Sequence, residues 1–131
     1  VLVAGPAADL SYPYEWLGDD PRVLNDLLSG AHPAAEVLKG AKKPLLILGM
    51  SAIARHDGEE IYAASRGIAQ KYHMLKGDWN GFSVLHHAAG RVGALDVGFT
   101  PGKEGRDISR ILDGAQSGEI KFVYLLGVDE I

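Results

Sequence analysis

The sequence predicts an α/β fold in which helices flank a parallel β-sheet, and two observations lead to this prediction. Short continuous apolar runs, such as residues 44–49 and 121–126, are typical of strands buried on both faces of a parallel sheet. Stretches with apolar residues at helical spacing lie between such runs. An alternation of strands and helices is typical of parallel sheets joined by right-handed crossovers.

Three strands are expected along the chain. The first, residues 1–4, ends at a Gly-Pro pair of the kind that forms turns. The second, residues 44–49 (PLLILG), is apolar throughout, so we expect Ile47 to lie in the core. The third, residues 121–126 (KFVYLL), precedes a glycine, and its pattern places Phe122 in the core as well.

Five helices are expected beside these strands. Each has apolar residues three or four positions apart, and most begin at a proline or an acidic residue and end near a glycine. Val37 and Leu38 form the expected apolar side of the second helix, and Asp57 and Glu60 have the spacing of a capping box in the third. The predicted helices are residues 20–29, 33–39, 57–72, 81–95 and 108–117.

Residues 9–18 contain Tyr12, Tyr14 and Trp16 close together. This composition indicates an ordered loop rather than regular secondary structure, because large aromatic side chains bury much surface wherever they pack. We expect the rings to pack and to take no part in catalysis.

Residues 1–131 are expected to form a single unit. The length is common for one domain, and the sequence has no internal repeat, low-complexity tract or flexible linker. The chain opens on Val1, directly in a predicted strand, and closes just after another one. We therefore expect it to be a fragment of a longer polypeptide.

Composition argues against several classes of protein. A net charge of -4 with interspersed acids and bases offers no basic stripe for nucleic acid. No apolar run approaches the roughly 20 residues that span a bilayer, so direct membrane insertion is not expected. The chain has no cysteine, which excludes disulfides, thiolate nucleophiles and cysteine-ligated clusters within it.

The loops that follow the predicted strands are the natural places for a ligand, because parallel sheets bind ligands at the carboxyl ends of their strands. These loops are residues 5–9, 49–55 and 127–131. Backbone amides beside Gly49 and Gly127 would suit a phosphate or a pterin. The same glycines are also ordinary strand terminators, and no G-x-G-x-x-G fingerprint occurs.

Two further motifs fall short of known catalytic patterns. Ser51 follows a strand and a glycine as in a nucleophile elbow, but Ile53 stands where the second glycine is needed. We therefore interpret Ser51 as a turn or cap residue. Residues 98–103 (GFTPGK) resemble a phosphate loop, but their spacing is too short and Glu104 replaces the required hydroxyl residue.

The histidines do not form a metal-binding pattern. His86 and His87 are adjacent and would point to different sides of the predicted helix, whereas His73 lies at the end of another helix. His32 and His56 are interpreted as loop or cap residues. We therefore predict no metal ligand among them.

Three segments resemble a known family. Residues 5–21 (GPAADLSYPYEWLGDDP), 42–58 (KKPLLILGMSAIARHDG) and 93–102 (GALDVGFTPG) are similar, in order and spacing, to the large iron-sulfur subunit of respiratory NADH:quinone oxidoreductase, or complex I. The resemblance covers almost the whole chain. It implies that residues 1–131 are a Rossmann-like fragment of a larger molybdopterin-oxidoreductase-type domain.

The resemblance also implies what the chain does and does not bind. The family's iron-sulfur clusters are held by cysteines in an N-terminal ferredoxin-like region, so they are expected outside this fragment. Residues 127–130 depart from the glycine-x-asparagine-proline turn of active molybdopterin enzymes, and the domain in complex I is generally regarded as lacking molybdenum. We therefore expect no catalytic, cofactor-binding or metal-binding residue here.

The function implied is structural. The fragment is expected to brace the cluster-bearing part of a subunit that transfers electrons from NADH to quinone, coupled to proton translocation. Its expected partners are other peripheral-arm subunits, on the cytoplasmic side of the bacterial inner membrane or the mitochondrial matrix side. The alternative is a pterin-dinucleotide-binding fragment of an active molybdopterin oxidoreductase, suggested by the strand-end loops and the segment around Asp96.

Overall fold

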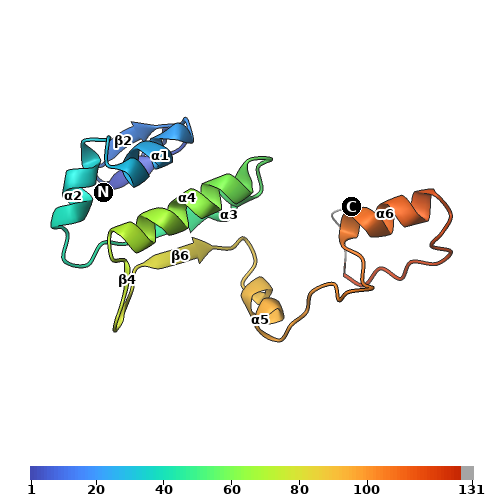
Figure 1. The fold of residues 1–131 in the computed structure, drawn as a ribbon. Helices are drawn as coiled ribbons and strands as arrows, with labels where there is room; N and C mark the ends of the chain where they lie inside the picture. The colour runs from blue at the N-terminus through green and yellow to red at the C-terminus, as the bar shows by residue number, and fades with distance from the viewer. Residues whose placement is uncertain (128–131) are drawn as a thin grey trace. The chain divides into compact units, whose positions relative to one another are not determined.

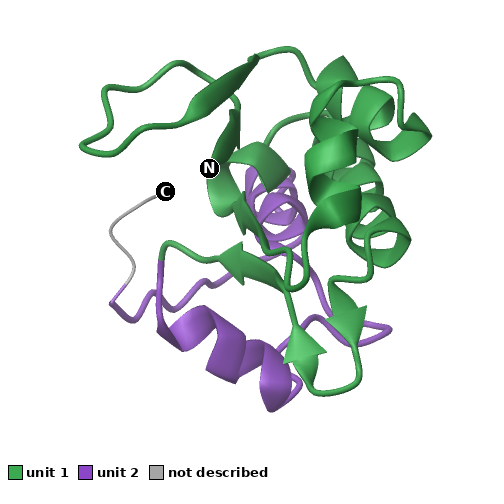
Figure 2. Ribbon diagram, turned by 90° about the vertical axis from the view of Figure 1, so that its left-hand side faces the viewer, with its two compact units in different colours: residues 1–87 green, residues 88–131 purple. Residues whose placement is uncertain are grey.

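The computed structural model describes residues 1–127 of the chain. The chain divides into two compact units, residues 1–87 and residues 88–131, which Figure 2 shows in different colours. Among residues 1–127, no helix combines the length and the apolar character that crossing a membrane requires. That residues 1–131 are a single fragment of a larger domain stays a prediction.

The first unit begins with two short parallel strands, β1 (Leu2–Ala4) and β2 (Glu15–Gly18). The strand expected at residues 1–4 is confirmed. The expectation of a loop over residues 9–18 is wrong for its last four residues, because their backbone pairs with β1: the Glu15 amide donates to the Val1 carbonyl at 2.9 Å. The indole of Trp16, half exposed, donates to the Gly5 carbonyl at 2.9 Å and anchors the connecting loop.

Two helices follow, α1 (Arg22–Ser29) and α2 (Ala34–Gly40), close to the predicted ranges. α1 ends at Gly30, whose φ of 93° lies in the left-handed region that favours glycine. His32, expected to be a loop or cap residue, lies in the loop before α2, and its Nδ1 accepts a hydrogen bond from the Ala34 amide at 3.1 Å. Val37 was expected on the apolar side of α2, but it is 60% exposed. The small side chains at the start of α2 are buried instead.

The centre of this unit is a strand-helix-strand arrangement (Figure 1). Strand β3 (Leu46–Gly49) leads into the short helix α3 (Met50–Ile53) and then α4 (Gly58–Lys71). β3 pairs in parallel with β6 (Phe82–Leu85). This connection confirms the α/β fold with parallel strands and flanking helices.

The helix predicted over residues 81–95 is wrong in its first half. Residues 82–85 form β6 because β3 offers them a parallel partner, and the Leu46 amide donates to the Gly81 carbonyl at 2.7 Å where the pair begins. Phe82 and Val84 alternate with more exposed neighbours, which is the two-residue period of a strand. Helix occurs later, as α5 (Gly90–Asp96).

A hairpin of β4 (Leu75–Lys76) and β5 (Trp79–Asn80) connects α4 to β6. Met74, just before it, is 1% exposed. The Trp79 indole donates to the Pro44 carbonyl at 3.0 Å, and the ammonium of Lys43 lies 5.2 Å from the centre of the same ring. These contacts fix the hairpin to the start of β3.

The core of the first unit lies between α1, α2, α4 and one face of the β3–β6 pair. The buried face of α4 follows the helical spacing expected for residues 57–72 and includes Ile61 and Ile68. Ile47 was expected in the core, but 55% of it is exposed. Its strand has a single neighbour and one covered face within the described unit, so the side chains of its other face remain uncovered.

The second unit contains α5 and α6 (Ile108–Gln116). The Asp107 carboxylate caps α6 by accepting a hydrogen bond from the Arg110 amide at 2.9 Å. The strand expected at residues 121–126 is not formed, and Phe122, expected in the core, is 80% exposed. A strand needs a hydrogen-bonded neighbour, and the regular elements described in residues 88–127 are helices.

Candidate functional site

The candidate site is the edge of the β3–β6 pair where both strands end. Gly49 of β3 lies opposite Leu85 of β6 in the parallel register. Parallel sheets bind ligands at the carboxyl ends of such strands. The structure therefore brings together the loop at residues 49–55 and the residues that follow β6. Of the third expected loop, residues 128–131 lie outside the described part of the chain.

Ser51 does not form a nucleophile elbow. It lies in the first turn of α3, and its side chain is exposed. Activation of a serine requires a base within hydrogen-bond reach, typically a histidine. The side-chain hydrogen bonds found within residues 1–127 include none that Ser51 makes. Ser51 was interpreted as a turn or cap residue, but it lies within α3, whose N-cap is Gly49 and which has no side-chain cap hydrogen bond.

Arg55 is the cation of the loop after β3, and it is already paired. Its Nε and Nη2 donate to the two carboxylate oxygens of Asp57 at 2.7 and 2.9 Å. These hydrogen bonds lower the pKa of Asp57 and raise the pKa of Arg55. The capping box predicted for Asp57 and Glu60 is wrong, because the Asp57 carboxylate binds Arg55 and makes no cap bond to α4. The pair leaves no free cation from this arginine for an anionic ligand.

His86 and His87 directly follow β6, so they lie in a loop and not in the predicted helix. Nδ1 of His86 is closed to solvent and has no hydrogen-bond partner among residues 1–127. His73, after α4, is exposed and has a φ of 56°. Within residues 1–127, no group of three or more His, Cys, Asp or Glu side chains is placed to hold a metal ion.

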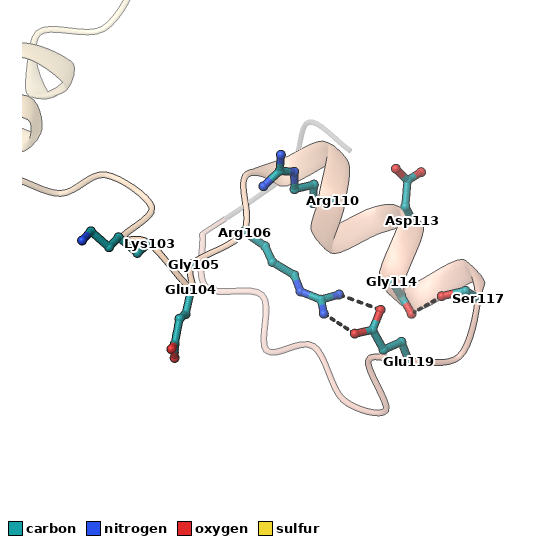
Figure 3. Close-up of a pocket in the computed structure, with 9 residues that line it drawn as sticks. All are labelled: Lys103, Glu104, Gly105, Arg106, Arg110, Asp113, Gly114, Ser117 and Glu119. Carbon is teal, nitrogen blue, oxygen red and sulfur yellow. Dashed lines mark hydrogen bonds and ion pairs between the residues drawn. The ribbon is translucent and has the colours of Figure 1, made fainter.

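The second unit has a hollow of about 510 Å³ beside α6 (Figure 3). Arg106 reaches across it and makes two hydrogen bonds to the Glu119 carboxylate, and these bonds lower the pKa of that carboxyl. Lys103 points away from this pair. The ion pair thus links the chain before α6 to the chain after it. Residues 98–103 are exposed and form no phosphate-binding loop around the hollow.

This ion pair was not predicted from the sequence. Arg106 and Glu119 are 13 positions apart and lie on opposite sides of α6 in the sequence. An ion pair within one helix can be predicted from the sequence, because its opposite charges are three or four positions apart. Here the turn after α6 brings the two side chains together, and no local pattern encodes that turn's geometry.

Comparison with known proteins identifies the family. The family model of molybdopterin oxidoreductases matches residues 1–131. The chain belongs to this family. The match covers both compact units, and it agrees with the parallel strands and flanking helices of the first unit.

Curated relatives of this family member confirm the resemblance to the large iron-sulfur subunit of complex I. The chain is 39% identical over 127 residues to the mitochondrial "NADH dehydrogenase [ubiquinone] iron-sulfur protein 1" of Solanum tuberosum, covering 97% of this chain and 16% of the relative. It is 35% identical to an NADH-quinone oxidoreductase subunit of Rickettsia bellii, with coverages of 97% and 17%. It is 37% identical to the "NADH-ubiquinone oxidoreductase 75 kDa subunit" of Reclinomonas americana, with coverages of 100% and 18%. The chain thus spans less than a fifth of the length of these relatives.

The family name implies a molybdopterin cofactor, and the side chains described at the β3–β6 edge offer its phosphates no unpaired arginine or lysine. A pterin dinucleotide carries phosphates that need cations or free amides. Arg55 is bound to Asp57, and the Nδ1 of His86 is closed to solvent. Leu85 presents an apolar side chain, 60% exposed, where the strand ends. The chain has no cysteine for a metal or cluster.

Proposed function

We propose that the chain is a structural part of the large iron-sulfur subunit of an NADH:quinone oxidoreductase. The observation that carries this proposal is the 35 to 39% identity to three such subunits over 97 to 100% of the chain. The absence of cysteine supports a structural role, since the chain cannot supply a thiolate to an iron-sulfur cluster. Any cluster of the intact subunit is bound by residues outside this chain.

In this role, residues 1–131 form one fragment of a molybdopterin-oxidoreductase-type domain and have no catalytic activity of their own. They brace the cluster-bearing part of the subunit and contact other peripheral-arm subunits. The complex transfers electrons from NADH to quinone and couples this to proton translocation. The fragment lies peripheral to the membrane, on the cytoplasmic side in bacteria or the matrix side in mitochondria. We assign no catalytic, cofactor-binding or metal-binding residue to it.

Two substitutions in the full-length subunit test a structural role. Ile68→Asp buries an unpaired charge at a residue that is 1% exposed, which is strongly destabilising. We expect loss of the assembled complex on a native gel and an equal loss of NADH:quinone electron transfer. Ser51→Ala, at an exposed position, is the matched control and should leave both unchanged.

The ratio of electron transfer to assembled complex separates the structural role from a catalytic one. For a structural segment, this ratio stays constant in both variants because only the amount of complex changes. A large loss of turnover in Ser51→Ala with normal assembly would contradict the proposal. Molybdenum and pterin bound stoichiometrically to the full-length subunit would favour an active molybdopterin enzyme instead.

A further inference from the structure

Asn80 and Gly81 form the one Asn-Gly dipeptide of the sequence, at the junction between β5 and β6. Asparagine is chemically most reactive before glycine, because glycine has no Cβ to hinder attack by its backbone nitrogen on the side-chain amide. The other asparagine, Asn25, lies within α1 and precedes Asp26. Asp57 and Asp113 also precede glycines, but an ionised carboxylate is a much poorer electrophile than an amide. Asn80 is therefore the most reactive position of this kind.

The fold requires both residues of the dipeptide. A Cβ at Gly81 would lie 2.3 Å from the Pro44 carbonyl oxygen, so glycine is the residue that fits without a backbone shift. The side-chain oxygen of Asn80 accepts a hydrogen bond from the Phe82 amide at 3.2 Å, which links the end of β5 to the start of β6. The structure thus keeps a reactive pair of residues at this junction.

Backbone hydrogen bonds hold the Gly81 nitrogen away from the side chain of Asn80. The Gly81 amide donates to the Met74 carbonyl at 2.6 Å, and both residues are buried. Asn80 is itself held in strand geometry by its pairing with Leu75. To attack, the Gly81 nitrogen must lose its proton and turn toward Cγ of Asn80, so it must leave Met74. The reaction therefore requires local opening of the hairpin.

We propose that Asn80 is a site of spontaneous deamidation to isoaspartate, which the folded hairpin suppresses through the hydrogen bond from Gly81 to Met74. The Gly81 nitrogen forms a bond to Cγ of Asn80, and the bond from Cγ to the side-chain nitrogen breaks. Ammonia leaves and carries the proton of the Gly81 amide. Water then opens the resulting succinimide ring to isoaspartate or aspartate, and no oxidant or reductant takes part.

The product and the native junction exclude each other. Isoaspartate places Cβ of residue 80 in the main chain and so lengthens the main chain before Gly81 by one carbon atom. Gly81 is held on both sides, because its amide donates to Met74 and its carbonyl accepts from the Leu46 amide at 2.7 Å. A longer main chain cannot keep both hydrogen bonds in this geometry. Isoaspartate therefore forms in chains whose hairpin is open, and it marks them.

Ageing of the full-length protein tests this proposal, and the test does not depend on the activity of the whole subunit. The protein is incubated in mildly alkaline buffer, in its native state and in guanidinium chloride. Trypsin then releases residues 77–91, which contain Asn80, and residues 23–39, which contain Asn25. Mass spectrometry measures the exchange of NH for O in each peptide, with fragmentation that distinguishes isoaspartate from aspartate.

In guanidinium chloride, we expect isoaspartate at residue 80 to form faster than any conversion at Asn25. In the native protein, the rate at Asn80 should be at least about tenfold lower, because ring closure then requires the open hairpin. Equal rates in the two states would overturn the proposal, as would the absence of isoaspartate at residue 80 in guanidinium chloride. These two results do not depend on the folding of any variant.

Two variants aged in the native state test the role of the hairpin. Trp79→Phe removes the hydrogen bond from the indole to the Pro44 carbonyl and should speed conversion of Asn80 by about fivefold, the gain in open hairpin expected for one lost hydrogen bond. Trp16→Phe removes a similar bond, to the Gly5 carbonyl, and is the control that should leave the rate unchanged. The same rate at Asn80 in both variants would overturn the proposal.

Discussion

The Tyr72 hydroxyl donates a hydrogen bond to the Leu27 carbonyl oxygen at 2.7 Å, and both residues are buried. Leu27 lies in the last turn of α1, where backbone carbonyls have no partner within the helix. Lys71 donates to the next carbonyl, that of Leu28, at 2.6 Å. The end of α4 thus caps the end of α1, 45 positions earlier in the sequence.

Tyr72→Phe is expected to destabilise the chain by about 1 to 3 kcal/mol, because it leaves a buried carbonyl without a partner while keeping the ring. Urea unfolding followed by circular dichroism measures this as a lower midpoint with an unchanged slope. Tyr62→Phe is the matched control, since Tyr62 is 37% exposed. Equal midpoints for the two variants would show that the hydrogen bond to Leu27 contributes nothing to the free energy of unfolding.

Gly81→Ala is expected to destabilise the first unit by more than about 1 kcal/mol, the range of overpacking in a tight site. A Cβ at Gly81 would lie 2.3 Å from the Pro44 carbonyl oxygen and 2.6 Å from the Trp79 indole nitrogen. Both atoms belong to the hydrogen bond that fixes the hairpin to β3. The measurement is the thermal midpoint of unfolding.

Gly40→Ala is the control for this substitution. A Cβ at Gly40 has no heavy atom within 4 Å, so it meets no steric conflict. We expect its thermal midpoint to stay equal to that of the unmodified chain or to rise slightly, since alanine favours helix over glycine. A midpoint for Gly81→Ala as high as for Gly40→Ala would contradict the close approach at Pro44.

The sequence predicts much of the first unit because its local patterns agree with its tertiary contacts. β3 is a continuous apolar run, and the buried face of α4 follows helical spacing from Ile61 to Tyr72. β6 was mistaken for helix because Val84 and Leu85 also fit the helical spacing of the residues after them. Only the parallel pairing with β3, which is remote in sequence, decides between the two.

The prediction of a strand at residues 121–126 was wrong for a related reason. Its apolar run satisfies the propensity for a strand, but a strand also needs a hydrogen-bonded neighbour, and propensity does not specify one. Ile47 was likewise expected in the core because a parallel strand is usually covered on both faces. At the candidate site, Ser51 was expected in a turn or cap but lies within α3, and the pairing of Arg55 with Asp57 was not predicted.

The ion pair of Arg106 and Glu119 predicts a pH dependence in the second unit. The hydrogen bonds from Arg106 hold the pKa of Glu119 below its usual value. A carboxyl whose pKa is lowered on folding stabilises the fold above its unfolded pKa, and this contribution is lost as the pH falls through the lowered value. The side chains are 36% and 63% exposed, so the effect on stability is small and decreases with salt.

Titration of the Glu119 side-chain carboxyl by NMR tests this ion pair. Arg106→Gln is expected to raise the pKa of Glu119 toward its ordinary value, because the charged donor is lost. Arg110→Gln, beside the same hollow, is the control and should leave the pKa unchanged. An equal pKa in the unmodified chain and in Arg106→Gln would rule out the pairing.

Two isoleucines test the assignment of the inner and outer sides of the first unit. Ile68→Ala removes a side chain that is 1% exposed and should cost about 2 to 5 kcal/mol, through lost burial and the cavity left behind. Ile47→Ala, at a residue that is 55% exposed, should cost less than about 1 kcal/mol in the isolated chain, near the range of surface substitutions. Urea unfolding of the two variants measures the difference. A cost at Ile47 equal to that at Ile68 would show that the Ile47 side chain is buried in the folded chain.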